Sequence, residues 1–416
     1  MSSKLSFRIA LLTYATKPRG SVVHTLELAA ALKALGHKPV VFALDKDGQG
    51  FHRDVDFETY AVPASLCDGG IEALIKQRIG EFVAFFRRHA QKYDIYHAQD
   101  CLSANALAIL RERDDISCFV RTVHHVERFR SPYLQDCQEK SIYLPDRCCV
   151  VSEQWQQVLE RDYGVVAHRV VNGVNKRFSS IEDGSEIALR QLLGLRNGPI
   201  YLTVGGIEPR KNSITLLEAF ALVRKQQPQA QLIIAGGATL FDYQDYRDEF
   251  MRRCEALGVR DALVLPGVVE DAMMPALYRV ADGFVFPSIR EGWGLVVLEA
   301  IASGLRVVVS DRPPFTEFLT GDLLGTVAVL VNAEEVEEIA RAMVAVTERE
   351  GVVRAWEVGS GELHSAADNQ CSACSADFSG RRRGEMIGRR ARMSLLERYC
   401  WRRSARMHVA LYEQFV

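Results

Sequence analysis

The feature that most constrains the fold is a regular alternation of short apolar segments with longer segments of helical periodicity. Apolar segments of strand length occupy residues 8–15, 39–44, 94–98, 118–124 and 147–152. Between them lie segments such as 22–36 and 71–90, whose apolar residues recur at helical spacing. This alternation predicts a parallel sheet covered by helices on both faces.

A second series of the same kind begins near residue 199. Its strand candidates are residues 199–206, 230–237, 262–267, 283–288 and 306–311. Polar chain without a strand pattern separates the two series, so we predict a domain boundary at about residues 176–195. The fold class that follows is α/β, with two doubly wound, Rossmann-like domains that face each other across a cleft.

The predicted domains are residues 1–178 and residues 195–350, and a terminal helix at about 400–416 completes the first. Residues 351–386 are rich in Gly, Ser, Asp and Asn, and we predict an irregular insertion, or a stretch read out of frame. Cys371 and Cys374 lie in this stretch, but no second cysteine pair accompanies them, so we predict no metal site.

Composition narrows the classes of protein that remain. The 416 residues carry 51 Lys and Arg against 53 Asp and Glu, and this balance predicts no nucleic-acid partner. Ten cysteines without regular spacing favour buried thiols in a reducing compartment, so we expect a cytoplasmic protein. We expect neither a signal peptide nor a membrane span, because Glu299 and Arg306 interrupt the longest apolar run.

Two nucleotide-binding motifs are missing from the chain. The first strand is followed by neither G-x-G-x-x-G nor a P-loop, so a dinucleotide dehydrogenase and a P-loop kinase are disfavoured. Gly20 still allows an anion to approach the start of a helix, although a turn glycine is the commoner explanation.

The segment V-G-G-I-E-P-R-K-N opens the second domain at residues 204–212. A strand ends in two glycines, and Arg210 and Lys211 come just before a helix. Two cations beside a helix N-terminus suit a diphosphate. The alternative is a pair of solvated surface cations.

The segment S-I-R-E-G-W-G-L-V-V-L-E-A at residues 288–300 is the most informative motif. A strand leads to Glu291, Gly292 and Gly294 form a turn, and the following helix carries Glu299. Two carboxylates so spaced suit hydrogen bonds to sugar and ribose hydroxyls. A buried, hydrogen-bonded glutamate is the alternative explanation for Glu299.

With these motifs, the chain resembles the retaining glycosyltransferases of family GT4, which have the GT-B fold. The resemblance covers about residues 5–350 and the terminal helix. It implies that Glu291 binds the donor sugar, that Glu299 binds the ribose, and that Arg210 and Lys211 hold the diphosphate. Donor-binding positions implied by the resemblance are Gly20, Gly206, Arg210, Lys211, Glu291, Gly292, Gly294, Leu295 and Glu299.

The resemblance also implies the catalytic set His124, Arg210, Lys211 and Glu291. His124 matches the strand-end histidine of the sugar site, and Asn172 matches the N-G-V turn before the linker. Gly206 stands where family members commonly have Arg, which puts one phosphate contact in doubt. Weak acceptor-side candidates, placed by analogy, are Lys17, Arg19, His125, Glu127 and Tyr133.

The expected function is transfer of a sugar, with retention, from a UDP- or GDP-type donor to an unidentified hydroxyl, without a metal or cofactor. The acceptor is a small molecule, a glycan or a lipid-linked molecule. A GT-B-like epimerase, a phosphorylase and a catalytically impaired nucleotide-sugar-binding protein stay open as alternatives. Ten Arg against three acids between Asp377 and Arg406 suggest either a solvated helix face or peripheral contact with the inner membrane face.

Overall fold

The structure is a computed structural model that describes residues 6–237, 243–348 and 374–415, with the side chains of residues 374–385 left out. The chain divides into two compact units. Unit 1 contains Met1–Asn175 and Arg398–Val416, and unit 2 contains Lys176–Glu397. The predicted class, two Rossmann-like α/β domains, is confirmed by two parallel sheets, and each unit is described by itself.

The sheet of unit 1 has the strand order β3-β2-β1-β4-β5-β6-β7, and all its strands pair in parallel. Its strands are β1 (Arg8–Thr13), β2 (Lys38–Asp45), β3 (Glu58–Pro63), β4 (Ile95–Ala98), β5 (Val120–Val123), β6 (Arg147–Val150) and β7 (His168–Arg169). The sequence did not predict β3 and β7. Both are edge strands without the apolar run that identifies a buried strand, and β7 has only two residues.

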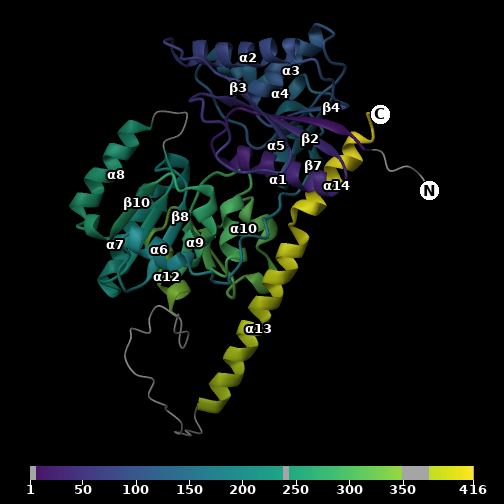
Figure 1. The fold of residues 1–416 in the computed structure, drawn as a ribbon. Coiled ribbons are helices and arrows are strands. Elements are labelled where there is room, and N and C mark those ends of the chain that lie inside the picture. The colour runs from purple at the N-terminus through teal and green to yellow at the C-terminus, as the bar shows by residue number, and fades with distance from the viewer. Residues whose placement is uncertain (1–5, 238–242, 349–373, 416) are drawn as a thin grey trace. The chain divides into compact units, whose positions relative to one another are not determined.

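Helices cover both faces of this sheet (Figure 1). They are α1 (Gly20–Ala34), α2 (Ile71–Arg88), α3 (Cys101–Glu112), α4 (Pro132–Tyr143), α5 (Glu153–Tyr163) and α14 (Trp401–Tyr412). Tyr96 of β4 packs in the core formed with α2 and α3. Its neighbour His97 points the opposite way and bonds to Tyr412 of α14 at 2.7 Å, so α14 covers the other face beside α1.

The sheet of unit 2 has the strand order β10-β9-β8-β11-β12-β13 and is also parallel. Its strands are β8 (Ile200–Val204), β9 (Gln231–Ala235), β10 (Leu263–Gly267), β11 (Gly283–Phe286), β12 (Arg306–Ser310) and β13 (Ala328–Val331). The sequence predicted the first five and missed β13, which again lies at an edge and whose two middle residues are only partly buried.

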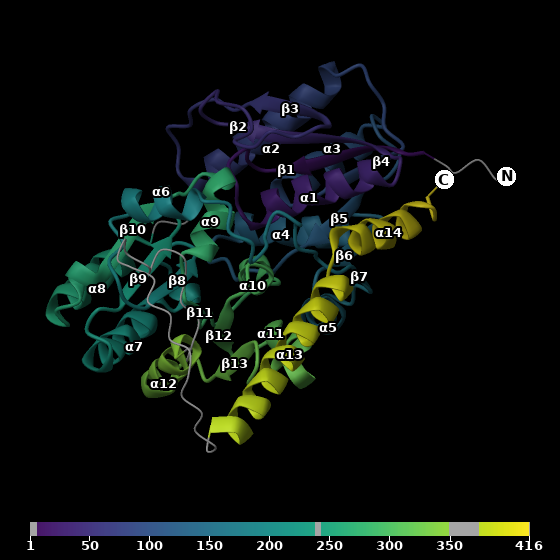
Figure 2. The ribbon, with the colours of Figure 1, turned by 60° about the horizontal axis from the view of Figure 1, so that its bottom comes forward.

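One hydrophobic core holds three helices of unit 2, α7 (Ser213–Gln226), α8 (Gln244–Ala256) and α12 (Val336–Thr347), against the sheet (Figure 2). The other helices are α6 (Ser185–Leu192), α9 (Met274–Arg279), α10 (Leu295–Ala302), α11 (Phe315–Phe318) and α13 (Cys374–Arg398). The 3-10 turns η1 (Pro209–Lys211), η2 (Arg260–Ala262), η3 (Asp271–Met273) and η4 (Gly321–Leu323) lie in loops.

Helix α13 corrects part of the predicted irregular stretch. The sequence predicted irregular chain over residues 351–386, but the structure is helical from Cys374 onward. The C-terminal half of α13 packs through buried Leu395. Because a nucleated helix extends at small cost per residue, chain without apolar periodicity can continue it. Residues 351–373, including Cys371, lie outside the described residues.

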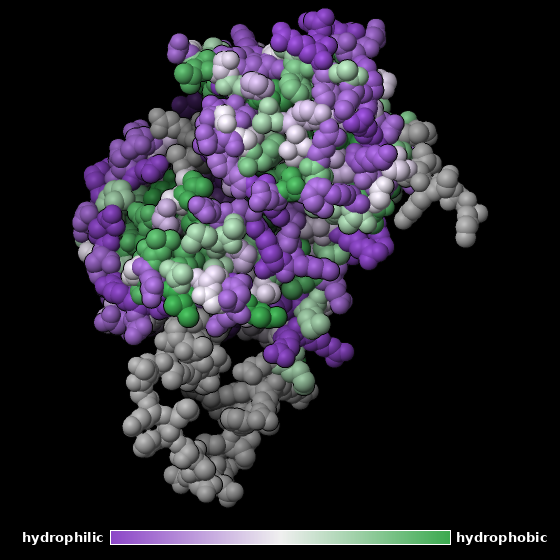
Figure 3. All heavy atoms as spheres, viewed as in Figure 1, coloured by the Kyte–Doolittle hydropathy of each residue, from purple (hydrophilic) through white to green (hydrophobic). Residues whose placement is uncertain are grey.

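The predicted thiol environment is confirmed for four cysteines, Cys137, Cys148, Cys149 and Cys254, which are buried and free. Large exposed apolar side chains are scattered among polar ones, as the face drawn in Figure 3 shows. Among the described residues, no helix has both the length and the apolar character needed to cross a bilayer.

Candidate active site

Two loops at the carboxyl edge of the unit 2 sheet are joined to each other. Strands β8 and β11 are parallel neighbours, so the loops that follow them leave the same edge. The carbonyl oxygen of Arg210, in the loop after β8, accepts hydrogen bonds from the Ile289 amide (2.9 Å) and the Ser288 hydroxyl (2.8 Å). This junction fixes η1 beside the Glu291 turn.

Three side chains converge on one carboxylate oxygen. Glu291 Oε1 accepts from Lys211 Nζ at 2.6 Å, from Ser288 Oγ at 2.7 Å and from Arg210 Nη1 at 3.0 Å. Glu208 Oε2 holds Arg210 from another side at 3.0 Å to Nε. We call Glu208, Arg210, Lys211 and Glu291 the ion cluster; its two cations and two anions balance.

Burial makes the charges of the ion cluster strongly interdependent. The side chains of Lys211 and Glu291 are 12% and 10% exposed, whereas Arg210 keeps 38% of its surface open to solvent. Burial lowers the pKa of Lys211 to about 8, although the charge of Glu291 opposes that shift. Burial by itself raises the pKa of Glu291, but Lys211, Arg210 and Ser288 together outweigh it, so that pKa lies below its ordinary value.

The glycines after β8 allow a close backbone contact. A Cβ atom on Gly206 would lie 2.7 Å from the Gly237 carbonyl oxygen and 2.8 Å from Glu208 Oε1. An arginine at this position, common in the similar family, therefore does not fit without a shift of the backbone. Arg210, four residues later, supplies the guanidinium of this loop instead.

The second part of the motif forms the start of α10. Gly294 caps the helix with φ +88°, and Leu295 is its first residue. Glu299, one turn further, is 9% exposed and accepts a hydrogen bond from the Tyr278 hydroxyl at 2.7 Å. Glu299 is therefore a hydrogen-bonded buried glutamate in this structure, and its role toward a ribose stays a prediction. Gly292 lies in the turn between Glu291 and Gly294.

Unit 1 contains a group of buried histidines. His124 follows β5, and its buried Nε2 atom has no hydrogen-bond partner among the residues that the structure describes. Burial, followed by the charges of His24 and Arg121, holds the pKa of His124 well below its ordinary value, so the ring is neutral. His24 of α1 contacts it edge-on with ring centroids 4.7 Å apart, and Asn172 Oδ1 lies 2.8 Å from His24 Nδ1.

Gly20 is the first residue of α1, and apart from its chain neighbours and its own helix backbone no described heavy atom lies within 4 Å of the place where its Cβ would be. His24 lies four residues later on the same face of the helix. The predicted first-loop glycine thus has open space beside it, as an approaching anion requires. The role of Gly20 in binding a diphosphate stays a prediction.

The acceptor-side candidates all lie in unit 1, but no described contact joins them into one group. Lys17 pairs with Asp47 at 2.7 Å, and Arg19 is the N-cap residue of α1. His125 Nε2 lies 3.3 Å from Glu127 Oε1, and Lys76 lies over the Tyr133 ring at 4.6 Å.

One group of described residues has the geometry to hold a metal ion, namely His97, Cys149 and His408. Both ring nitrogens of His97 already have partners, the hydroxyls of Tyr412 and Thr122, each at 2.7 Å. Burial raises the pKa of the Cys149 thiol far above its ordinary value, so the metal-binding thiolate is disfavoured. These three residues fit a hydrogen-bonded polar core better than a metal centre.

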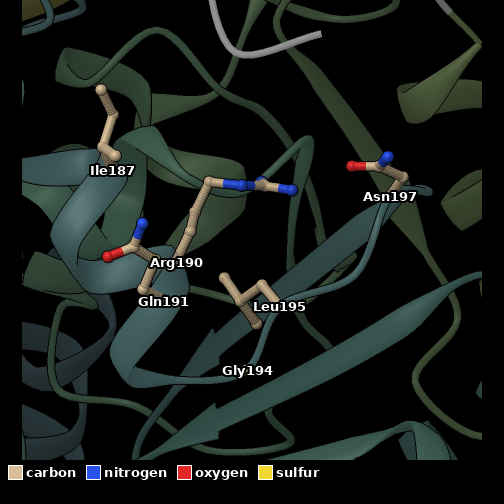
Figure 4. Close-up of a pocket in the computed structure, with 6 residues that line it drawn as sticks. All are labelled: Ile187, Arg190, Gln191, Gly194, Leu195 and Asn197. Carbon is tan, nitrogen blue, oxygen red and sulfur yellow. The ribbon is translucent and has the colours of Figure 1, made fainter. Parts of the chain in front are cut away.

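A separate hollow of about 260 Å³ lies between α6 and the start of β8 (Figure 4). Its lining is Ile187, Arg190, Gln191, Gly194, Leu195 and Asn197. None of these residues belongs to the predicted site.

The structure thus brings Glu291 into contact with Arg210 and Lys211, which lie 81 and 80 residues before it in the chain. Sequence reasoning missed Glu208, Ser288, Tyr278 and His24. Glu208 and Ser288 lie inside the two motifs, so their positions at strand ends were an available signal. Tyr278 and His24 lie on helices, where only the fold shows their partners.

Two family models match the chain in sequence. The model described as Glycosyltransferase Family 4 matches residues 18–178, and the model described as Glycosyl transferases group 1 matches residues 186–357. Together they cover most of both units.

Individual proteins are similar to this chain at lower identity. Mannosylfructose-phosphate synthase of Agrobacterium fabrum is 31% identical over 159 residues, which are 37% of this chain and 35% of that protein. D-inositol 3-phosphate glycosyltransferase of Kribbella flavida is 25% identical, over 82% of this chain and 87% of that protein. The crystal structure of Anabaena Alr3699/HepE in complex with UDP and glucose matches with TM-score 0.70 and 17% identity, over 98% of this chain and 99% of that one.

Proposed function

The chain belongs to the GT4 type of glycosyltransferases with the GT-B fold, and on this premise we propose that it transfers a sugar from a nucleotide-diphosphate donor to an acceptor hydroxyl. The anomeric configuration is retained, and no metal takes part. The observation that carries the proposal is the convergence of Arg210 and Lys211 on Glu291 at the carboxyl edge of the unit 2 sheet.

The ion cluster suits the chemistry of this transfer. The bond between C1 of the sugar and the diphosphate oxygen breaks, and its electron pair leaves on the phosphate. Arg210 and Lys211 stabilise that negative charge, so the two cations take the place of a metal ion. The acceptor oxygen bonds to C1 from the same side, and its proton passes to the departing phosphate.

Glu291 has two tasks in this proposal. Without a donor it neutralises Lys211 and Arg210, and with a donor it accepts hydrogen bonds from sugar hydroxyls. A diphosphate therefore competes with Glu291 for the two cations, and the carboxylate becomes available when the phosphate arrives. The role of His124 toward the sugar stays a prediction from the resemblance; its ring is neutral, and its Nε2 has no hydrogen-bond partner among the described residues.

The first experiment tests donor binding. UDP and GDP, with their glucose and mannose derivatives, are screened by thermal shift and calorimetry; UDP leads the panel because the Anabaena relative was crystallised with it. We expect Arg210→Ala and Lys211→Ala each to weaken nucleotide diphosphate binding by at least tenfold, because each removes a charged phosphate contact. Unchanged affinity in both variants would contradict the diphosphate assignment.

The second experiment separates an enzyme from a catalytically impaired binding protein. Glu291→Gln keeps the shape of the side chain but removes its charge. We expect UDP binding to be retained or tightened while transfer falls by about 10- to 150-fold, the cost of a lost charged hydrogen bond. Equal transfer rates in the variant and the wild type would exclude Glu291 from the reaction. If the wild-type protein binds the donor but never consumes it, the result favours the catalytically impaired binding protein.

Two further readouts test the finer parts of the proposal. Proton NMR of the product reports whether the anomeric configuration is retained, and a rate unchanged by EDTA supports transfer without a metal. An epimerase would instead change the sugar nucleotide with no acceptor present.

We propose a cytoplasmic location with peripheral contact to the inner membrane face. Exposed arginines on the last two helices support this: Arg389, Arg390 and Arg398 on α13, and Arg402, Arg403 and Arg406 on α14.

A further inference from the structure

One buried tyrosine connects Glu299 to a neighbouring helix of unit 2. The hydroxyl of Tyr278, in α9, donates a hydrogen bond to Glu299 Oε2 at 2.7 Å. Tyr278 is fully buried, whereas Glu299 keeps a small part of its surface open to solvent. Burial, followed by the charge of Glu299, raises the pKa of Tyr278 well above its ordinary value. The hydroxyl therefore keeps its proton and acts as a donor to the carboxylate.

A hydroxyl donor affects a carboxylate differently from a cation. In the ion cluster two cations neutralise Glu291, whereas the partner that α9 gives to Glu299 is a neutral hydroxyl. A hydroxyl orients the carboxylate without cancelling its charge, and it uses one of the roughly four lone-pair sites that a carboxylate offers. A carboxylate held in this way can accept further strong hydrogen bonds from the hydroxyl groups of a ligand.

The helix that carries Tyr278 is fixed at both ends by ion pairs. Before α9, Asp271 of η3 accepts two hydrogen bonds from the Arg177 guanidinium, at 2.6 and 2.7 Å. At the end of α9, Arg279 pairs with Glu186, and both of these residues are buried. Because breaking a buried ion pair costs stability, α9 is held in one position in unit 2.

The ring of Tyr278 is packed as closely as its hydroxyl is bonded. Phe178 contacts the ring edge-on with centroids 5.6 Å apart, and Phe284 of β11 contacts it with centroids 5.8 Å apart. Strand β11 leads through the Glu291 turn into α10, so the strand that supports the Tyr278 ring also leads to the helix that carries Glu299. The hydroxyl donor is therefore in place before any ligand binds.

We propose that Tyr278 is a positioning residue, which holds the Glu299 carboxylate so that it accepts hydrogen bonds from the ribose hydroxyls of the donor nucleotide. The inference rests on the proposed function and deepens it, because it assigns recognition of the ribose to a pair of residues on two helices. Without the Tyr278 hydroxyl, the carboxylate has more orientations available. Each hydrogen bond to the ribose then also has to order the Glu299 side chain, which weakens binding.

The test measures how strongly the full chain prefers a nucleotide that has its ribose hydroxyls. Calorimetry compares UDP with 2′,3′-dideoxy-UDP, and GDP with 2′,3′-dideoxy-GDP. We expect the wild type to prefer the hydroxylated form by about 10- to 150-fold, the value of hydrogen bonds to a charged group. In Tyr278→Phe we expect this preference to fall by about three- to tenfold, the contribution of one neutral hydrogen bond.

Tyr201→Phe is the matched control, because it also removes a buried hydroxyl from unit 2. Tyr201, in β8, is fully buried, and its hydroxyl donates to Gln227 Oε1 at 2.7 Å and lies 2.9 Å from Thr347 Oγ1. A merely structural role predicts the same result for both tyrosine variants. We expect Tyr201→Phe to keep the wild-type preference, with circular dichroism as the check that both variants fold.

Glu299→Gln completes a double-mutant cycle. It should remove most of the preference by itself, and in its background Tyr278→Phe should change the preference no further, because the tyrosine acts through Glu299. If Tyr278→Phe does not fold, Glu299→Gln decides alone: loss of the preference supports the inference, and an unchanged preference overturns it.

Two further results would overturn the inference and leave the proposed function standing. One is binding of UDP or GDP with no preference over the dideoxy form, and the other is an equal preference in Tyr278→Phe and Tyr201→Phe. Failure of both UDP and GDP to bind the wild-type chain would instead contradict the proposed function, and the inference with it.

Discussion

Lys211 shows how a single residue is adapted by its surroundings. Its ammonium lies 4.3 Å from the centre of the Phe286 ring and 2.6 Å from Glu291 Oε1. Burial of the amine disfavours its charge while the Glu291 carboxylate favours it, and burial prevails, so the pKa of Lys211 lies at about 8. The amine therefore remains charged at neutral pH but loses its proton within a range that experiments reach.

A pH dependence of donor binding follows from this shift. In the unfolded chain Lys211 stays protonated to about pH 10.4, but in the folded protein it loses its proton as the pH rises through about 8. If the charged amine binds phosphate, UDP affinity measured by calorimetry weakens above pH 8 by up to about tenfold per pH unit. Lys211→Arg keeps its charge, so its affinity stays flat over the same range. Identical pH profiles for the two proteins would contradict the role of the Lys211 charge.

At the scale of elements, the join between the Glu291 turn and α10 depends on one glycine. Gly294 has φ +88°, and a Cβ there would lie 2.6 Å from Phe315 Cε1 of α11. The helix start and the short helix beside it can therefore approach only when residue 294 has no side chain. This contact sets the direction in which α10 leaves the turn and so where Glu299 lies.

Gly294→Ala is expected to destabilise unit 2 through both strain and overlap. A left-handed backbone costs an alanine about 1 kcal/mol, and overpacking adds about 1–3 kcal/mol. Gly258→Ala isolates the first contribution, because Gly258 has φ +65° and open space around its Cβ position. Thermal unfolding followed by circular dichroism should show a melting temperature clearly lower for Gly294→Ala than for Gly258→Ala. Equal melting temperatures would mean that the Phe315 contact is not tight.

At the scale of the whole molecule, the chain returns to complete its first unit. Helix α14, at the very end of the sequence, packs beside α1, and Trp401 and Tyr412 are buried there. Tyr412 bonds to His97 in the middle of the unit 1 sheet. Unit 1 is therefore built from both ends of the chain, whereas the ion cluster belongs to unit 2.

Removal of residues 398–416 is expected to lower the thermal transition of unit 1 by exposing this apolar and histidine-rich face. The transition that UDP stabilises, which reports on unit 2, should persist. Truncation after Glu413 is the control, because it keeps α14. Tyr412→Phe is a milder perturbation of the same face: it leaves His97 Nδ1 without its hydrogen bond, at a cost of about 1–3 kcal/mol. Differential scanning calorimetry with and without UDP separates the two transitions. Loss of the UDP-sensitive transition alone would contradict this division.

Much of this architecture could be predicted from the sequence because buried parallel strands are continuous apolar runs. β1, β2, β4 to β6 and β8 to β12 were predicted for that reason, and the two motifs placed Arg210, Lys211 and Glu291 at strand ends. Edge strands β3, β7 and β13 escaped prediction because they are only partly buried and so lack a recognisable buried-strand pattern. The start of α13 escaped because helix propagation needs no periodic pattern.

By itself the sequence determined the fold class, the two-unit order along the chain and the residue types of the candidate site, since these follow from periodicity and from motifs local in the chain. Only the tertiary structure decided that Lys211 and Arg210 share one oxygen of Glu291, that Glu208 is buried beside Arg210, and that α14 returns to His97. Such contacts join residues far apart in sequence, and their distances depend on how the strands pair and the helices pack. Periodicity within a segment carries no information about that pairing.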